Sequence, residues 1–226
     1  MTMEQQLEKL EKRNKRPTVA LKMMAMVAIT IQLSACGNDC DVSDVKALAG
    51  RDLTQCELEG AYLEGANLDS AILEGANLTG AYLEDANLRD ANLNGAYLDS
   101  ANLKGAYLDS AILVNATLEG ANLFRANLFR AYLRGAILFH ANLEGADLRE
   151  AKLMYALLEG ADLREAKLMH AELDSANLED ANLREAKLEG ANLKDADLRN
   201  ANLEGAINVP ELSAKQEEDA CRSDCG

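Results

Sequence analysis

Residues 61–80 read AYLEGANLDSAILEGANLTG, which is four copies of a five-residue unit that begins Ala-x-Leu. Alanine recurs at every fifth position from Ala61 to Ala206, thirty times, and leucine recurs from Leu53 to Leu203, thirty-one times. No insertion or deletion interrupts this register. Such a strict period indicates a repeat architecture, in which each unit packs against its neighbours along the chain.

The five-residue period excludes a helix. At ~100° per residue, a five-residue step turns the apolar position by ~140°, so the leucines would spiral around the helix surface. Twelve of the fifteen glycines lie between residues 60 and 205, and each would penalise a helix by about 1 kcal/mol. A flat sheet also fails, because a long strand needs a two-residue period throughout.

A coil of short straight segments fits the pattern. Ala and Leu are two residues apart, so a three-residue strand points both side chains to one side, and the next two residues turn the chain. Stacked coils then enclose Ala and Leu and expose the other three positions. Glycine at the fifth position, as at Gly60 and Gly65, favours a sharp corner. Proline is absent from 51 to 206, as expected if backbone N–H groups bond between coils.

Individual units carry a family resemblance. Ala-Asn-Leu-Glu-Gly (201–205), Ala-Asp-Leu-Arg-Glu (146–150) and Ala-Asn-Leu-Lys-Asp (191–195) resemble the pentapeptide-repeat family, over residues 51–206. The resemblance implies an all-β fold: a right-handed quadrilateral β-helix (β-solenoid) of about 31 pentapeptide repeats, with four repeats in each coil. At the ~4.8 Å spacing of paired strands, such a rod is roughly 37 Å long. Short capping segments are expected at both ends, because an open coil presents unpaired strand edges.

Residues 1–35 differ from the repeats and are predicted to form a signal peptide. They hold six Lys or Arg, three Glu and an apolar run from Met23 to Leu33 that is too short to span a bilayer. The sequence LSAC at 33–36 resembles a bacterial lipobox. This resemblance implies cleavage before Cys36, lipidation of Cys36 (as by palmitate), and attachment to the cell envelope at the periplasmic face of the outer membrane. The alternatives are an ordinary cleaved signal and a membrane-surface helix.

The rest of the chain divides into three predicted segments. Residues 36–50 form an N-terminal tether and cap, residues 51–206 form the β-helix, and residues 207–226 form a C-terminal cap and tail. Pro210 breaks the strand pattern just after the last repeat. Residues 211–222 are predicted to form a short polar helix.

Four further cysteines lie near the ends of the repeats: Cys40 and Cys56 at one end, Cys221 and Cys225 at the other. An even number of cysteines in an oxidising compartment suggests disulfides. A disulfide needs Cα atoms within about 7 Å, so the rod implied by the resemblance restricts the pairs to Cys40–Cys56 and Cys221–Cys225. In the alternative interpretation Cys56, which occupies an alanine position, is a buried free thiol.

The residues predict no enzyme, no cofactor and no metal site. The two histidines, His140 and His170, are thirty residues apart. With four repeats per coil, that separation is one and a half coils, which places them on opposite sides. No set of nucleophile, base and orienting group is available. The sequence also lacks a phosphate-binding loop and a dinucleotide fingerprint.

One stretch stands out in charge and aromatic content. Residues 121–140 carry three Arg and no acid, between residues 57–120 with eleven acids and two bases and residues 141–205 with fifteen acids and eight bases. Exposed aromatics beside Arg are typical of binding anchors. The predicted partner-binding belt consists of Phe124, Arg125, Phe129, Arg130, Tyr132, Arg134, Phe139 and His140. In the alternative interpretation the Phe rings lie flat against neighbouring coils.

Charge limits the choice of partner. The chain has a formal net charge of −15, which opposes direct nucleic-acid binding. The leading interpretation is a non-catalytic, lipid-anchored protein of the cell envelope that acts as a protein-binding or scaffold module. Its protein partner and its oligomeric state stay open. Two alternatives are a passive structural spacer and an acidic DNA mimic that binds a topoisomerase such as gyrase, as the resemblance implies for some relatives.

Overall fold

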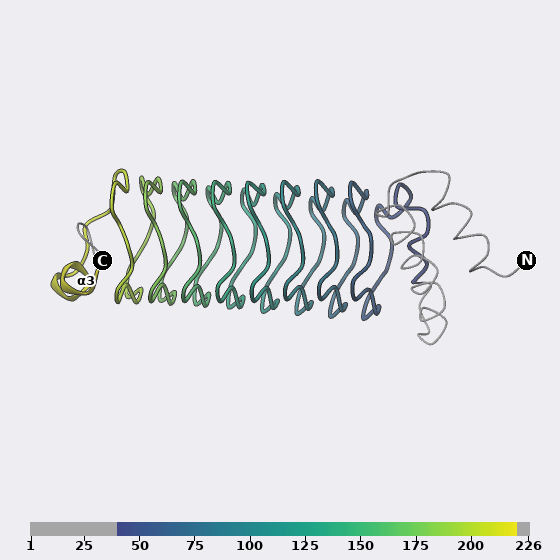
Figure 1. Ribbon diagram of the computed structural model, residues 1–226, viewed down its shortest axis with the longest axis horizontal. Helices are drawn as coiled ribbons and strands as arrows, with labels where there is room; N and C mark the ends of the chain where they lie inside the picture. Colours follow the sequence, from purple (N-terminus) through teal and green to yellow (C-terminus); the bar gives the residue numbers. More distant parts are fainter. Residues whose placement is uncertain (1–39, 221–226) are drawn as a thin grey trace, which may run out of the picture.

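The computed structural model describes residues 40–220, which form a straight stack of similar coils with a short helix at the C-terminal end (Figure 1). Parallel bridges join residues twenty apart throughout, from Asp52↔Ile72 to Lys187↔Ile207. Each coil therefore contains four of the five-residue units, and each unit has one bridging residue, then the leucine, then a two-residue turn. The predicted signal peptide and lipidation site, and the predicted Cys221–Cys225 pair, lie outside the described residues.

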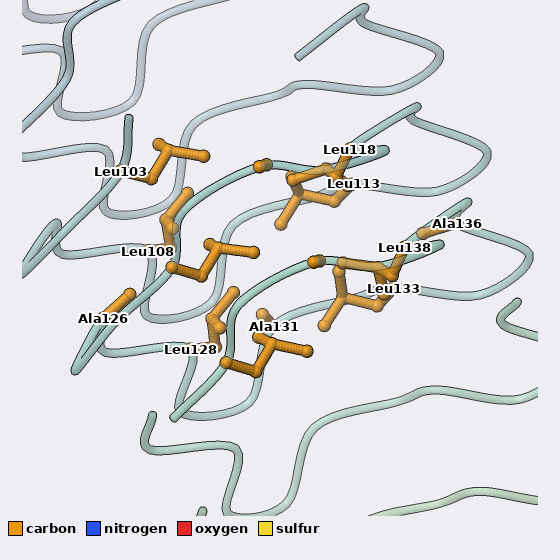
Figure 2. Packing of buried hydrophobic residues seen from close by; sticks show 14 of the residues in the cluster. Leu103, Leu108, Leu113, Leu118, Ala126, Leu128, Ala131, Leu133, Ala136 and Leu138 are labelled. Carbon is orange, nitrogen blue, oxygen red and sulfur yellow. The ribbon is translucent and has the colours of Figure 1, made fainter. Parts of the chain in front are cut away.

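The interior of the rod is built from the repeat leucines and alanines. Every repeat leucine from Leu53 to Leu203, and every repeat alanine from Ala61 to Ala201, is at most 5% exposed. Figure 2 shows the leucines of successive coils stacked on one another inside the ribbon, with Ala126, Ala131 and Ala136 beside them. Burial of each leucine contributes about 1.5–3 kcal/mol before chain entropy is subtracted. The inward position predicted for Ala and Leu is confirmed.

Backbone hydrogen bonds account for four of the five N–H groups in a unit. The leucine and the fifth residue donate to the following coil, as Leu53 N does to Ile72 O at 2.7 Å, and the bridging residue donates to the preceding coil, as Ile72 N does to Arg51 O at 2.8 Å. The alanine N–H closes the turn, as Ala61 N does to Leu58 O at 3.0 Å. Proline is therefore disfavoured at these positions, because it has no N–H to donate.

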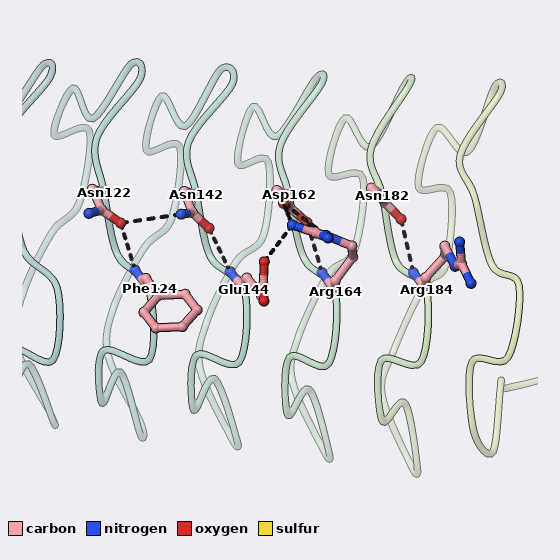
Figure 3. Close-up of polar contacts among 8 residues, drawn as sticks. All are labelled: Asn122, Phe124, Asn142, Glu144, Asp162, Arg164, Asn182 and Arg184. Atoms are coloured by element: carbon pink, nitrogen blue, oxygen red, sulfur yellow. Dashed lines mark hydrogen bonds and ion pairs between the residues drawn. The ribbon is translucent and has the colours of Figure 1, made fainter.

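Asparagine serves the remaining N–H group. Where the bridging residue is Asn or Asp, its side-chain oxygen accepts from the N–H two residues later: Phe124 N lies 3.2 Å from Asn122 Oδ1, and Glu144 N lies 3.1 Å from Asn142 Oδ1 (Figure 3). The amide Nδ2 of Asn142 also donates to Asn122 Oδ1 in the coil before it. These bonds explain why Asn is so frequent between Ala and Leu.

The fifth residue of each unit adopts the left-handed conformation. All fifth-position residues from Gln55 to Gly205 have φ between +52° and +69°. Glycine is favoured there, as predicted, because it has no Cβ to clash. At Gly160 the absent side chain also leaves the space that the His140 imidazole occupies. Residues such as Arg130 adopt the same φ at a cost of about 1–2 kcal/mol, which the hydrogen bonds to the next coil offset.

A disulfide closes the N-terminal end. Cys40 and Cys56 are bonded, with their Cα atoms 5.8 Å apart, and this is the pair expected from the sequence at this end. In the structure Cys56 is therefore not the free thiol of the alternative interpretation. Val42 and Leu48 are buried in the same cluster as the repeat leucines. The segment before the first repeat thus covers the leucines that the first coil would otherwise expose.

Helix α3 (Ala214–Asp219) closes the C-terminal end. It is shorter than the helix predicted over 211–222, because Ser213 caps its N-terminus through a reciprocal pair of hydrogen bonds with Gln216. The buried Gln216 amide also donates to Leu193 O at 2.8 Å and Ala196 O at 3.0 Å. These bonds satisfy carbonyl groups in the last turns of the rod. Within residues 40–220, no helix combines the length and apolarity that crossing a membrane requires.

Replacing Gln216 by Ala is expected to destabilise the C-terminal end by about 1–3 kcal/mol, because two buried carbonyl groups lose their donor. Hydrogen exchange should accelerate at residues 181–205 and stay unchanged near residue 60. Lys215→Ala, an exposed change in the same helix, is the matched control and should leave exchange unaltered. Equal exchange in the two variants would contradict the capping role of Gln216.

Candidate binding surface

The bridging residues form four columns along the rod, and we name each column a side. Side 1 runs from residue 52 to residue 192 in steps of twenty, and sides 2, 3 and 4 begin at residues 57, 62 and 67 in the same way. We name the two-residue turn between two sides as a corner, so corner 1/2 joins side 1 to side 2. Residues twenty apart in sequence are therefore neighbours along one side or one corner.

The structure distributes the predicted belt around a whole coil. Its four fourth-position residues fall at four different corners: Phe124 at corner 3/4, Phe129 at corner 4/1, Arg134 at corner 1/2 and Phe139 at corner 2/3. A single flat partner surface cannot contact all four corners at once. The predicted belt residues therefore do not form one continuous face.

The phenylalanine rings are partly covered by arginine. The guanidinium carbon of Arg125 lies 4.8 Å from the Phe124 ring centroid, and that of Arg130 lies 4.7 Å from the Phe129 centroid. Phe129 is also approached by Arg149, at 5.4 Å. The rings are half-buried, between the outward and the flat arrangements expected from the sequence. Side 4 separates Phe124 from Phe129, which follow one another along the chain.

Sides 1 and 2 bring other belt residues beside apolar side chains. Tyr132 bridges to Ile112 on side 1, and Ile137 bridges to Leu157 on side 2. The guanidinium carbon of Arg134, at the corner between them, lies 5.7 Å from the centroid of the Tyr155 ring. We call this surface the apolar patch and define it by Ile112, Val114, Tyr132, Ile137, Tyr155 and Leu157. Tyr132 and Tyr155 are 41% and 51% exposed.

A hollow lies within the apolar patch at corner 1/2. It has a volume of about 340 Å³ and is lined by Val114, Asn115, Arg134, Gly135 and Tyr155. Gly135 contributes no side chain, and a Cβ at this position would collide with the Asn115 side chain. A hollow between an aromatic ring and a guanidinium group can receive an apolar side chain of a partner.

A second depression runs along side 4 and corner 3/4, with a volume of about 880 Å³. Its walls are charged, with Arg125, Lys167 and Lys187 facing Asp147, Glu165 and Glu185. Burial raises the pKa of Asp147, but hydrogen bonds from Arg149 and the charges of Arg149 and Lys167 outweigh burial, so its pKa lies below the usual value. The remaining wall residues are Ala126, Asn127, Gly145, Gly205 and Ile207.

Ion pairs are concentrated on sides 3 and 4. Arg164 at corner 3/4 pairs with Glu144 and Asp162 (Figure 3), and Arg130 at corner 4/1 lies 2.7 Å from Glu150. Arg199, near the C-terminal end of side 2, pairs with Glu179 and Asp197. Among residues 40–220, no ion pair involves a residue of side 1 or corner 1/2.

Within residues 40–220 the two histidines lie apart from one another. His140 lies at corner 2/3 and His170 at corner 4/1, which are not adjacent corners. Within the part of the chain that the structure describes, no three His, Cys, Asp or Glu side chains are grouped so that they could hold a metal ion. Three features described above are available for recognition: the apolar patch with its hollow, the ring and guanidinium pairs at Phe124 and Phe129, and the charged depression on side 4.

Comparison with protein families places this geometry in a known group. The model for pentapeptide repeats matches in eight copies, with matched segments that together run from residue 48 to residue 207. A search of the curated proteins finds no significant match.

Solved structures of similar proteins include HetL, a pentapeptide-repeat protein involved in heterocyst differentiation regulation in the cyanobacterium Nostoc sp. strain PCC 7120. It shares 33% identity, with 80% of this chain and 89% of HetL covered and a TM-score of 0.37. QnrB1, a plasmid-mediated fluoroquinolone resistance protein, shares 18% identity, with 78% of this chain and 87% of QnrB1 covered and a TM-score of 0.60. The likeness to QnrB1 shows that the two chains share a fold.

Proposed function

Since this chain belongs to the pentapeptide-repeat family, we propose that it is a non-catalytic protein-binding or scaffold module, anchored to the bacterial cell envelope by a lipid on Cys36. One observation carries the binding role: enclosed leucine and alanine side chains fill the rod from Leu53 to Leu203, so recognition falls to the outer surface. In this proposal the rod is four-sided in cross-section and the chain winds in the right-handed sense, which is the sense that parallel crossover connections favour.

The partner-binding surface is proposed to lie on the coil of residues 121–140 and its neighbours. This region combines partly exposed aromatic rings with arginine, a composition enriched in binding anchors. Phe124–Arg125 and Phe129–Arg130 offer rigid ring and guanidinium pairs on either side of side 4. Tyr132 and Arg134 contribute to the apolar patch on the other half of the rod.

The disulfide supports a location outside the cytoplasm. Cys40–Cys56 would be reduced in most bacterial cytosols but persists in the periplasm and at the cell surface. Cys40 follows Cys36 by four residues, so a lipid on Cys36 would hold the N-terminal end of the rod close to the membrane. The periplasmic face of the outer membrane is the proposed site of attachment.

Labelling with radioactive palmitate tests the anchor. Wild-type protein is expected to incorporate the label and sediment with membranes, whereas Cys36→Ala should lose the label and leave the membrane fraction. Cys225→Ala, which removes a different cysteine, should keep both properties. An unlabelled cytoplasmic protein that retains residues 1–35 would contradict the proposal.

A DNA mimic is the second candidate, favoured by the formal net charge of −15. A DNA mimic carries a row of acidic side chains in place of the DNA phosphates, and a protein that normally binds DNA binds these acids instead. The disulfide opposes this role, because topoisomerases act in the reducing cytoplasm. If labelling fails and the protein is cytoplasmic, inhibition of gyrase by purified protein becomes the decisive measurement.

A further inference from the structure

The apolar patch differs in charge from the rest of the same coils. On side 1, corner 1/2 and side 2 of the coils that contain residues 112, 132 and 152, the charged residues are Arg134 and Lys152, both basic. Each lies against an aromatic ring of the patch, since the Lys152 ammonium is 5.1 Å from the Tyr132 centroid. The patch is therefore an apolar surface with two cations lying over aromatic rings and no acid inside it.

Acids surround the patch on three edges. The N-terminal edge carries Asp99, with Glu74 one coil further from the patch, the edge at corner 2/3 carries Glu119 and Glu159, and the C-terminal edge carries Glu172 and Asp174. No ion pair joins any of these six acids to another residue of the described range. This arrangement contrasts with sides 3 and 4, where Arg164 and Arg130 neutralise neighbouring acids.

The hydrogen bonds of the edge acids come from neutral donors. Asp99 accepts from the Thr117 hydroxyl at 2.6 Å and from the Glu119 backbone N–H at 2.9 Å. Asp174 accepts from the Asn192 amide at 2.5 Å. These contacts hold the carboxylates in place and leave their negative charge uncompensated, so a cationic group of a partner can add a charge-assisted bond at each edge.

We propose that the apolar patch binds a protein segment that inserts an apolar side chain into the hollow at corner 1/2 and places Lys or Arg over the surrounding acids. The proposal rests on the protein-binding function proposed above and identifies its surface and the chemistry of its partner. Anchoring by an apolar side chain in a pocket, with complementary charges at the rim, is the usual anatomy of a specific interface.

Charge complementarity favours this occupant over a second copy of the chain. Two patches docked face to face would bring together two acidic edges, on proteins that each carry a net charge of −15. Like charges placed opposite one another across an interface disfavour association. The same acids repel an anionic bilayer, so a lipid surface is also a poorer fit than a basic protein segment.

Site-specific photocrosslinking in the native host tests the location. The crosslinking amino acid p-benzoylphenylalanine is placed at Tyr155 in the patch, and at Tyr82 on side 3 and Phe124 at corner 3/4 as matched positions. We expect crosslinks from Tyr155 to a protein segment in which mass spectrometry finds apolar residues flanked by Lys or Arg. Crosslinks to an acidic segment, to lipid or to a second copy of the chain would overturn the proposal.

The matched positions separate the two proposals. If Tyr82 or Phe124 captures a partner and Tyr155 does not, protein binding stands and the assignment of the patch fails. If none of the three positions captures a protein, both the proposed function and the patch fail.

Binding of a synthetic peptide with the sequence of the crosslinked segment then tests the chemistry. Ile112→Ser/Tyr155→Ser is expected to weaken binding at least about 30-fold, because two central apolar contacts are lost. Tyr82→Ser/Tyr107→Ser removes equally exposed side chains from sides 3 and 4 and should change affinity less than about twofold. Equal losses in the two variants would overturn the proposal.

The acids are tested in the same assay. Glu172→Gln/Asp174→Asn should weaken binding about tenfold and reduce its dependence on salt concentration, because rim charges act largely through electrostatic attraction. Asp85→Asn/Asp90→Asn makes the same change in net charge at exposed residues of corners 3/4 and 4/1, outside both the patch and the charged depression, and should have little effect. If the two pairs act alike, the attraction is due to net charge and not to this surface.

Discussion

Replacing Ala131 by Phe is expected to unfold the middle of the rod, with a loss of at least about 3 kcal/mol in the free energy of unfolding, because overfilling a packed core displaces its walls. Ala131 has no exposed surface, and its carbonyl accepts from Lys152 N at 2.9 Å. A larger side chain would push apart both the leucine stack and this bond to the next coil. Thermal unfolding followed by circular dichroism measures the loss.

Lys152→Phe is the matched control, since it places the same ring one coil away on the outside of side 1. An outward substitution of this kind usually changes stability by about 0.5 kcal/mol or less. Comparable melting temperatures for the two variants would contradict the inward position of the alanines. Because each coil contacts only its neighbours, the damage in Ala131→Phe should spread along the rod from its centre.

Loss of the Cys40–Cys56 disulfide is expected to destabilise the protein by about 3 kcal/mol, the chain-entropy contribution of a loop of about fifteen residues. The bond joins positions sixteen residues apart and holds the N-terminal cap over the first coil. In Cys40→Ala/Cys56→Ala, amide hydrogen exchange should accelerate between residues 48 and 75, while residues 181–205 keep their protection. Cys56→Ala restores the residue that the repeats place at this position.

Reduction of the wild-type protein provides an independent comparison, because it breaks the disulfide without changing the side chains at positions 40 and 56 to alanine. If neither the double substitution nor reduction changes the melting temperature and the exchange pattern, the cap stays on the first coil without the disulfide.

The solenoid could be predicted from the sequence because its determinants are strictly periodic. Ala and Leu recur two positions apart in every unit, so a single rule places Leu53 and Leu203 alike inside the rod. The turn could be predicted from glycine at the fifth position, although residues such as Arg130 and Tyr155 show that the conformation is imposed by the stacked coils. The details of the C-terminal cap could not be predicted from the sequence, because the contacts of Gln216 with Leu193 and Ala196 join distant parts of the chain.

The candidate surface was harder to predict because neighbours on the outer surface are twenty residues apart in sequence, an interval that differs from the five-residue repeat of the interior. The belt was found by inspecting twenty consecutive residues, which in the structure encircle the rod. Tyr132 and Arg134 belong to the surface that we propose as the binding patch, but their neighbours in it are Ile112 and Tyr155, about twenty residues away in each direction. Aligning the sequence in rows of twenty residues would have revealed these contacts, whereas the hollow beside Gly135 depends on side-chain positions that spacing alone does not give.

Insertions and deletions affect the interior and the outer surface of the rod differently. The interior keeps its register when the length changes by any multiple of five residues, whereas the outer surface keeps its arrangement only for multiples of twenty. Residues 143–154 and 158–169 are identical, LEGADLREAKLM, at an offset of fifteen residues. Adding fifteen residues preserves the Ala and Leu register, yet it is only three quarters of a coil, so Arg149 lies at corner 4/1 and its copy Arg164 at corner 3/4. A gain or loss of three units would thus leave the interior intact while moving every later outward side chain to a different side of the rod. A single change in length can therefore alter the binding surface without altering the fold.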